Sequence, residues 1–355
     1  MNCDATALVV IPNAETVFAH LLEHAEEHDV VLDKRGPRDF KILVGKSHIA
    51  IGMDDTALSL TISAETISIL YFLKESAVQH LAEISPEAAE ALRWEDQNAA
   101  SPDQTAPPSF HELSLISASE PMDGLIRVRL TGATDITALA GPGIHVKLML
   151  PEIPGRTPVW PEASQNGVTK WPDGDDVLHV SYYTIKALDL QTGEIEIDIV
   201  RHDGGVIADW AAAVQPGAKI GLLGPGGGEV PDNAKRVLLC GDKTAIPAKA
   251  SMIEALADEV SGNSGAEAAT LDCLKAYLPA TDIRLHALPK ARFRKEIERY
   301  SESITAMEKP DFAWFAGEHK NAQAMRKLFK GELGLKKGEQ YAITYWRDGA
   351  SLEAN

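Results

Sequence analysis

The stretch RVLLCGDKTAIPA, residues 236–248, indicates the fold class of the C-terminal part of the chain. Its apolar run RVLLC is typical of a strand that is buried on both faces, and the glycine that follows lets the backbone turn. A helix is expected over Ile246–Ala257, with further strands at Asp282–Leu288 and Phe312–Phe315. Because strands alternate with helices, residues 233–355 are predicted to form an α/β domain with a parallel sheet and ligands at the strand ends.

Upstream, residues 110–232 show strand signals without helices between them. The expected strands are Leu125–Leu130, His145–Leu150, His179–Lys186 and Ile195–Val200. Turns rich in glycine and proline separate them, including GPG at 141–143 and LQTGE at 190–194. Several short strands at this spacing predict an all-β barrel.

Residues 1–95 indicate a small α+β domain of unassigned function. Expected strands are Ala7–Ile11, Lys41–Val44, His48–Met53 and Leu58–Ile62, and expected helices are Asn13–His28 and Ala64–Ile84. The polar, proline-containing segment NAASPDQTAPPS at 98–109 is typical of a linker, so residues 96–109 are predicted to join this domain to the barrel. The chain is thus expected to have three domains.

The composition excludes several classes of function. The net charge of −18 disfavours binding to nucleic acid or to anionic membranes, because both depend on neutralising phosphates. No apolar run reaches the ~18–20 residues of a membrane span, and Met1–Val10 lacks a signal-peptide pattern, so the chain is expected in the cytoplasm. Its 3 cysteines, Cys3, Cys240 and Cys273, lie far apart and predict neither a disulfide framework nor a cysteine metal site.

Six segments in order carry a resemblance to a known family. They are HVKLMLP at 145–151, YYTIK at 182–186, GEIEIDIVRH at 193–202, GDKTAIPA at 241–248, WFAGE at 314–318 and YWRDG at 345–349. Over residues 110–349 the chain resembles the siderophore-interacting proteins, which are ferredoxin-reductase-like flavoenzymes. The resemblance implies FAD on the barrel, NADPH or NADH on the α/β domain, and a ferric siderophore or other ferric chelate as substrate.

The same resemblance assigns the flavin site. It implies that Tyr183 and Thr184 lie at the flavin ring and that the turn RHDGGVIADW at 201–210 holds the pyrophosphate at a helix N-terminus. The full set of FAD-binding residues implied is Ser181, Tyr183, Thr184, Lys186, His202, Gly205, Val206, Ile207, Ala208, Trp210 and Thr244. Ser181 stands where the family usually has arginine, and Val206 and Ala208 replace the usual proline and serine, which weakens the case for tight retention of FAD.

The nicotinamide site is implied at two glycine turns, GDKTA and AGE, and at a basic segment. Its residues are Gly241, Asp242, Thr244, Ala245, Gly317, Glu318, Lys290, Arg292 and Arg294. If Asp282–Leu288 is the second strand of the sheet, Lys290, Arg292 and Arg294 follow the strand that often ends near the adenosine ribose, and they favour the 2′-phosphate of NADPH. A solvated basic turn, or docking of the siderophore, would explain these cations equally well.

Lys147 and Arg347 match basic positions of the family and are the candidate contacts to the ferric chelate; either could instead be a solvated surface charge. Ala350 stands where some relatives have a further basic residue, which weakens the case for a strongly anionic substrate. No protein nucleophile or general base is expected, because the flavin carries the chemistry.

The first predicted helix also carries His20, His24 and His28 on one stripe, with Glu23 and Glu27 nearby. Two histidines one turn apart can chelate a metal, but a solvated amphipathic face is the favoured interpretation, and no metal site is predicted.

The predicted function is NAD(P)H-dependent, FAD-mediated reduction of a ferric siderophore that releases iron(II). Two alternatives stay open. One is a family member that binds a chelate without turnover, and the other is a flavin reductase that serves a protein acceptor. The oligomeric state is left unpredicted.

Overall fold

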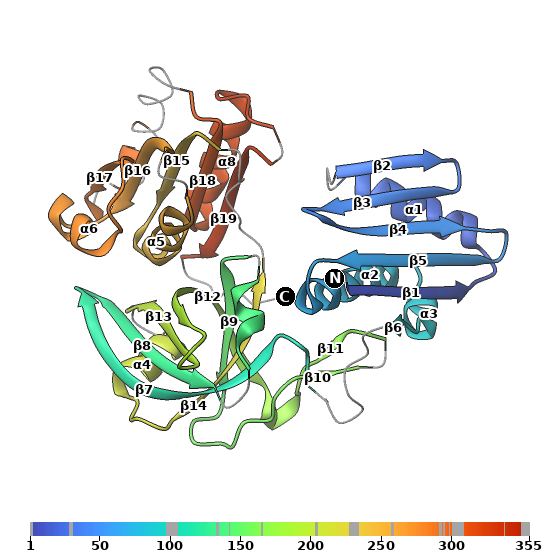
Figure 1. Ribbon diagram of the computed structural model, residues 1–355, viewed down its shortest axis with the longest axis horizontal. Coiled ribbons are helices and arrows are strands. Elements are labelled where there is room, and N and C mark those ends of the chain that lie inside the picture. Colours follow the sequence, from blue (N-terminus) through green and yellow to red (C-terminus); the bar gives the residue numbers. More distant parts are fainter. Residues whose placement is uncertain are drawn as a thin grey trace. The chain divides into compact units, whose positions relative to one another are not determined.

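The computed structural model describes residues 3–27, 31–96, 106–132, 135–141, 143–164, 166–202, 205–226, 234–256, 259–290, 293, 295–297, 299, 309–336 and 338–348. They divide into two compact units, both drawn in Figure 1. The N-terminal unit consists of residues 1–110 together with 151–178, and the C-terminal unit consists of residues 111–150 together with 179–355.

The N-terminal unit contains a six-stranded antiparallel sheet in the order β2-β3-β4-β5-β1-β6. Its strands are β1 (Cys3–Val10), β2 (Val31–Gly36), β3 (Asp39–Val44), β4 (Ser47–Met53), β5 (Ala57–Ala64) and β6 (Glu95–Asp96), and its helices are α1 (Ala14–Glu27), α2 (Ile67–Ile84) and α3 (Pro86–Ala91). Leu58, Leu60 and Ile62 of β5 are buried in one core with α1 and α2, whereas Ser59 and Thr61 on the other face are exposed. The helices therefore cover one face of the sheet (Figure 1).

Local chemistry sets the boundaries that differ from the sequence prediction. The second helix begins after Thr66, whose hydroxyl accepts the Ile69 amide at 3.2 Å, and not at Ala64, which ends β5. Strand β2 was missed, because its sequence VLDKRG lacks a regular apolar alternation. Residues 97–105 of the predicted linker lie outside the described residues, but Pro107 and Ser109 are buried, so the end of that segment packs.

Residues 151–178 lie between the barrel strands β9 and β12 in sequence, but they belong to the N-terminal unit. They carry the small hairpin β10 (Glu162–Ala163) and β11 (Thr169–Lys170) and the 3₁₀ turn η2 (Gly174–Asp176). The Thr169 amide donates to Glu75 Oε1 at 3.0 Å, and its hydroxyl lies 3.3 Å from that of Tyr71. The Trp94 indole donates to the carbonyl of Asn166 at 2.9 Å. The insertion is thus an integral part of the N-terminal unit.

The C-terminal unit begins with a closed barrel in the order β12-β13-β8-β7-β14-β9. Its strands are β7 (Phe110–Met122), β8 (Leu125–Gly132), β9 (His145–Pro151), β12 (Leu178–Asp189), β13 (Glu194–Val200) and β14 (Lys219–Gly226), with the 3₁₀ turn η1 (Thr137–Ala140) and helix α4 (Val206–Ala213). The predicted barrel is confirmed, although β7 and β14 were not predicted as strands. Ile207, Ala208 and Ala211 of α4 are buried in the barrel core.

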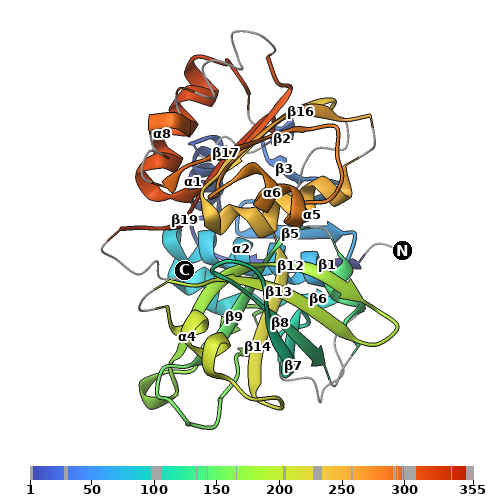
Figure 2. The same ribbon diagram turned by 90° about the vertical axis from the view of Figure 1, so that its left-hand side faces the viewer.

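The second part of this unit is a five-stranded parallel sheet in the order β17-β16-β15-β18-β19. Its elements are β15 (Arg236–Gly241), η3 (Lys243–Ala245), α5 (Ile246–Ala255), β16 (Ser261–Glu267), α6 (Leu271–Tyr277), β17 (Arg284–Leu288), β18 (Phe312–Glu318), α8 (His319–Gly331) and β19 (Gln340–Trp346). Val237 and Leu239 are buried with residues of α5, and Leu238 and Cys240 with residues of α8. Helices therefore cover both faces of the sheet (Figure 2), which confirms the α/β prediction.

One strand of this sheet overturns part of the sequence interpretation. Strand β16, with the sequence SGNSGAE, lies between β15 and β17, so the predicted strand Asp282–Leu288 is the third strand of the domain and not the second. The glycine and serine content of the β16 sequence SGNSGAE is typical of a loop. The composition has a physical reason, because a Cβ on Gly262 would lie 2.0 Å from the Val237 carbonyl oxygen.

The barrel and the parallel sheet are linked within the C-terminal unit by a charged cluster. Asp198 of β13 accepts two hydrogen bonds from the Arg127 guanidinium, at 2.7 and 2.8 Å. The Tyr277 hydroxyl at the end of α6 also donates to Asp198. A fully buried carboxylate thus pairs with a barrel arginine and a tyrosine of the α/β part, as buried charges require.

Candidate functional site

The parallel sheet has a switch in strand order at β15. The second and third strands lie on one side of β15, and the fourth and fifth lie on the other. In open α/β sheets, ligands bind where the carboxyl ends of strands diverge at such a switch. Strand β15 ends there with Gly241, and β18 ends there with Gly317 and Glu318, which are all predicted nucleotide residues.

Both glycines are required by close backbone approach. A Cβ on Gly241 would lie 2.5 Å from the Ala316 carbonyl oxygen. Gly317 has φ of 153°, and a Cβ there would lie 2.4 Å from Asp242 Oδ2. The two turns are therefore packed against each other, and no side chain at either position would fit.

Asp242 joins these turns. Its Oδ1 accepts the Thr244 amide at 2.9 Å and the Thr244 hydroxyl at 2.5 Å. Its Oδ2 accepts the Glu318 amide at 2.9 Å and the Trp346 indole N–H at 2.8 Å. Burial raises the pKa of Asp242, and these hydrogen bonds oppose the rise. The carboxylate binds the protein itself, and it connects the ends of β15, β18 and β19.

The Glu318 carboxylate is also directed at the protein. Its Oε2 accepts the amides of Lys320 at 2.7 Å and Asn321 at 3.3 Å, so Glu318 caps α8. An anion at this helix N-terminus would meet that carboxylate. Of the predicted nucleotide residues, Asp242, Thr244 and Glu318 thus position the turns, and Ala245 is fully buried.

On the barrel, the predicted ring residues lie on β12. The Tyr183 side chain packs against the barrel core together with Trp210, and burial raises its pKa. Thr184 is buried and hydrogen-bonds Tyr345, whose hydroxyl also lies 3.3 Å from His145 Nδ1. Tyr345 is the first residue of the segment YWRDG, but it was not predicted to be a site residue. Its place in that segment was the signal that could have revealed it.

Lys186 and Ser181 have partners of their own. Lys186 donates to Glu254 Oε1 of α5 at 2.6 Å, and the Ser251 hydroxyl donates to the Ile185 carbonyl at 2.8 Å. Ser181 Oγ lies 3.0 Å from His179 Nε2. The Lys186 ammonium is therefore neutralised within the protein.

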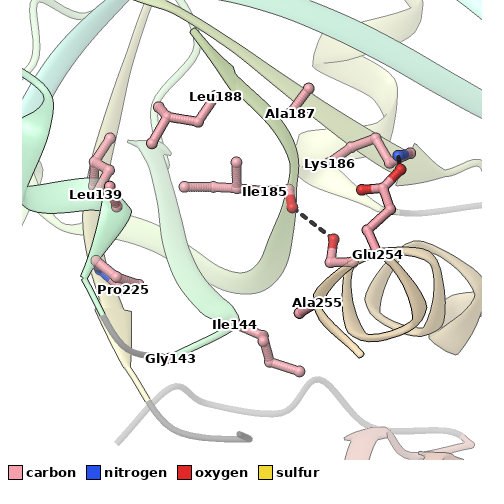
Figure 3. Close-up of a pocket in the computed structure, with 12 residues that line it drawn as sticks. Leu139, Gly143, Ile144, Ile185, Lys186, Ala187, Leu188, Pro225, Glu254 and Ala255 are labelled. Atoms are coloured by element: carbon pink, nitrogen blue, oxygen red, sulfur yellow. Dashed lines mark hydrogen bonds and ion pairs between the residues drawn. The ribbon is translucent and has the colours of Figure 1, made fainter. Parts of the chain in front are cut away.

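A cavity of about 400 Å³ lies beside this ion pair (Figure 3). Its lining comes from η1, β12 and α5 together with Gly143, Ile144 and Pro225. Ile185 is directed into it, whereas Lys186 and Glu254 point toward each other at its side. Tyr183 and Thr184 are not among its lining residues. This cavity is therefore distinct from the predicted ring position, although it shares strand β12 with it.

The predicted pyrophosphate turn leads into α4. Gly205 is its N-cap residue, and no side chain caps this helix. A Cβ on Gly205 would lie 2.5 Å from the His202 ring, so the histidine ring packs directly over Gly205. Amides of an uncapped first turn suit a phosphate, and the residues present therefore fit the pyrophosphate of FAD. Asp203 and Gly204 lie outside the described residues.

The structure describes three of the five basic residues predicted to bind the chelate or the nucleotide. Lys147 on β9 lies 5.5 Å from the ring centroid of Tyr182, a cation–π contact. Arg347 is exposed, with its guanidinium 3.4 Å from His319 Nδ1. Lys290 is exposed beyond β17, whereas Arg292 and Arg294 lie outside the described residues.

The second strand of the sheet ends with a carboxylate that sequence reasoning missed. Glu267 is the last residue of β16 and pairs with Leu288 of β17. Burial raises its pKa, as does Asp242, while Lys290 and Lys243 lower it. Position alone could have revealed it, had SGNSGAE been read as a strand.

In the N-terminal unit, the histidine stripe is divided. His20 is exposed, His28 lies outside the described residues, and His24 contacts His80 and Glu83 of α2. The two partners were not predicted, because they lie 56 or more residues away in sequence.

Comparison with known proteins agrees with this architecture. Residues 115–229 match the model of the siderophore-interacting FAD-binding domain, and residues 234–349 match that of the siderophore-interacting protein. Ferric vibriobactin reductase ViuB of Vibrio cholerae is 26% identical over 253 residues, covering 65% of this chain and 86% of that protein. Ferric acinetobactin reductase of Acinetobacter baumannii is 28% identical over 189 residues, covering 52% of this chain and 65% of that protein.

A solved structure gives the same result. The siderophore-interacting protein SipS from Aeromonas hydrophila superposes with a TM-score of 0.56 at 26% identity, covering 68% of this chain and 93% of that one. The two family models together span both parts of the C-terminal unit, and residues 1–110 lie outside them. The chain therefore belongs to the siderophore-interacting protein family.

Proposed function

We propose that this protein reduces the iron of a ferric siderophore, or of a similar ferric chelate, with electrons from NAD(P)H that pass through FAD. One observation carries the proposal. A closed barrel and a parallel sheet, with a glycine turn at the sheet's switch point, form one compact unit that two models of this family match. The named relatives ViuB and ferric acinetobactin reductase support the choice of a ferric chelate as substrate.

The flavin site on the barrel is assigned to β12 and α4. Tyr183 forms a wall of the ring site, and the Thr184 hydroxyl, which Tyr345 orients, faces the reacting edge. The first turn of α4 and Gly205 hold the pyrophosphate through backbone amides. When bound, FAD converts the two-electron chemistry of a nicotinamide into single-electron transfer to iron(III). The protein's own residues bind and orient the flavin and keep water away from it, and none acts as a nucleophile.

The nucleotide is assigned to the switch point of the parallel sheet. Gly241 and Gly317 leave room for it, and Asp242 keeps the two turns in register. The preference for NADPH is supported by Lys290, and it is opposed by Glu267 at the end of the second strand. Because β16 is the second strand of the sheet, the strand Asp282–Leu288 is not the one expected near the adenosine ribose. Glu267 ends the second strand instead, and a carboxylate there favours the free 2′-hydroxyl of NADH.

The ferric chelate is assigned to Lys147 and Arg347. Both are cations in a chain of net charge −18, and an anionic chelate needs a local positive field against that background. The sequence boundaries 1–95, 110–232 and 233–355 are proposed with one exception, residues 151–178, which belong to the N-terminal unit. The cytoplasmic location is proposed on the sequence alone. Within the described residues, no helix combines the length and the apolarity that crossing a membrane requires.

The test uses the purified full chain. Its absorption spectrum is recorded first, and then NADH or NADPH is added without oxygen, followed by a ferric siderophore and an indicator for iron(II). We expect flavin bands that bleach with the nicotinamide and return as iron(II) forms. A protein that carries no flavin after reconstitution with FAD would contradict the proposal.

One other function has specific support, and a second gives a different result in the same test. A family member that binds chelates without turnover is favoured by Ser181, Val206 and Ala208, and it would bind a ferric siderophore without oxidising NAD(P)H. In a reductase for a protein acceptor, the flavin would be reduced and reoxidised normally. Its rate of reoxidation by ferric chelates would then not exceed that by an artificial acceptor such as ferricyanide.

A further inference from the structure

Three potential metal ligands meet between two helices of the N-terminal unit, outside the family-matched residues. His24 Nε2 on α1 lies 3.1 Å from His80 Nδ1 on α2 and 3.9 Å from Glu83 Oε2 on the same helix. One ligand atom from each residue lies within 4.8 Å of those of the others. His80 and Glu83 are three residues apart, so both face the same side of α2.

The spacing of these atoms is suited to a transition-metal ion. Two imidazole nitrogens bound to one tetrahedral ion at the usual length of about 2.0–2.1 Å lie about 3.3 Å apart. The His24–His80 separation of 3.1 Å is close to this value. The Glu83 side chain is 64% exposed, and it can therefore rotate to shorten its distance.

The helix ends favour a positive charge at the same place. His24 lies in the last turn of α1, which ends at Glu27, and Glu83 lies in the last turn of α2, which ends at Ile84. Each helix C-terminus carries a partial negative charge. Two such ends and one carboxylate converge on the two imidazoles, which become effective ligands only when neutral.

The cluster is also accessible to an ion. The His24 side chain is 27% exposed, so the ring is held by packing while its edge reaches solvent. Three protein ligands with solvent on the remaining side resemble an open site, in which water completes the coordination. Two histidines and one carboxylate suit iron(II), zinc and similar ions, whereas magnesium and calcium prefer oxygen ligands alone.

We propose that His24, His80 and Glu83 form a binding site for a divalent first-row transition-metal ion. The site lies outside residues 115–229 and 234–349, which the two family models match, and it is independent of the proposed reductase function. Iron(II) and zinc share the chemistry that this ligand set recognises, and the experiment separates them. No electron transfer at this site is required.

The test is metal binding by the full chain after treatment with a chelator. Zinc is titrated by calorimetry, iron(II) is titrated without oxygen, and cobalt(II) is added as a spectroscopic probe. We expect one ion per chain, with an intense visible cobalt spectrum that reports a four-coordinate protein site, and no heat with magnesium. The tighter of iron(II) and zinc identifies the ion.

Three single variants locate the site. His80→Gln and Glu83→Gln each keep the approximate volume of the side chain, and each should weaken binding by at least about tenfold, as loss of a ligand does. His20→Gln is the matched control, because His20 lies one turn before His24 on the same helix and is exposed. Its binding should equal that of the wild type.

Either of two results would overturn the proposal. The first is equal affinity in the wild type and in His80→Gln, which would place the bound ion elsewhere. The second is a wild-type cobalt spectrum identical to that of the hydrated ion, which needs no variant and holds even where a substitution disturbs folding.

Discussion

Trp346 donates its indole N–H to Asp242 at 2.8 Å, and it thereby connects the last strand of the parallel sheet to the turn after the first. The same carboxylate oxygen accepts the Glu318 amide. One buried side chain thus holds three strand ends around the proposed nucleotide site, although Glu318 and Trp346 lie 76 and 104 positions after Asp242.

Replacing Asp242 should destabilise the fold and weaken nucleotide use together. Asp242→Ala leaves the Thr244, Glu318 and Trp346 donors without their acceptor, and we expect a loss of roughly 2–4 kcal/mol in unfolding free energy. Trp346→Phe removes a single donor and should cost roughly 1 kcal/mol. Chemical denaturation and KM for NAD(P)H measure both effects, and equal losses in the two variants would contradict a shared carboxylate.

Lys249 gives the fold a characteristic pH dependence. Burial lowers the pKa of Lys249 to about 8, and its ammonium donates to the Gly265 carbonyl at 3.0 Å. The unfolded chain holds this proton up to about pH 10.4, so between about pH 8 and 10.4 the unfolded state binds more protons. Stability from this group therefore rises with pH over that window, and below it the charged form is a net cost.

Comparison of the wild type with Lys249→Met isolates this group. The difference in unfolding free energy should change in favour of the wild type by about 3 kcal/mol between pH 7 and pH 10.5. Denaturant titrations at several pH values provide the measurement. Parallel curves for the two proteins would show that Lys249 titrates normally in the folded state.

The Thr184 hydroxyl should matter for flavin reduction more than for flavin binding. Thr184→Val keeps the shape of the side chain and removes the group that Tyr345 orients, and we expect the rate of flavin reduction by NAD(P)H to fall by about tenfold or more. Thr184→Ser keeps the hydroxyl and should retain most of that rate. Stopped-flow absorbance measures it, and similar rates in both variants would remove Thr184 from the reacting edge.

Lys147 and Arg347 should act through charge. Lys147→Gln and Arg347→Gln are each expected to raise KM for an anionic ferric chelate by about fivefold, since a partly screened charge contact contributes roughly 1 kcal/mol. Added salt should reduce the difference from the wild type. A neutral ferric chelate is the control, and an equal increase in its KM would mean that the side chains matter for another reason.

Glu267 and Lys290 should set the choice of nicotinamide in opposite directions. Removing the carboxylate in Glu267→Gln should raise kcat/KM for NADPH relative to NADH, because the 2′-phosphate no longer meets a negative charge. Lys290→Gln should lower the same ratio. Steady-state kinetics with both cofactors test this, and unchanged ratios in both variants would place the adenosine ribose elsewhere.

The sequence predicted the classes of structure better than the pairings between distant segments. RVLLC and GDKTAIPA marked a buried strand and the turn after it, and both are confirmed as β15 and η3–α5. The barrel also followed from regular turn signals. Strand β16 was missed because its glycine at 262 is dictated by the Val237 backbone, a tertiary constraint that local propensity cannot express.

At the sites, too, features that depend on local sequence were predicted, and contacts between distant segments were not. Gly241 and Gly317 were predicted as nucleotide residues, because a strand followed by glycine has a local signature, and both lie very close to other protein atoms. The partners of His24 could not be foreseen, since nothing near His80 in sequence refers to the first helix. The role of Asp242 was also missed, because a carboxylate after a strand gives no sign of whether it faces a ligand or the protein.

The insertion at residues 151–178 has a consequence for the order in which the chain folds during synthesis. The first 110 residues leave the ribosome well before Thr169, yet Tyr71 and Trp94 complete their hydrogen bonds only with that later segment. The N-terminal unit therefore cannot finish its structure as a separate early product. It must wait until the first three strands of the following barrel, β7, β8 and β9, have been translated, so the two units mature in an interleaved order.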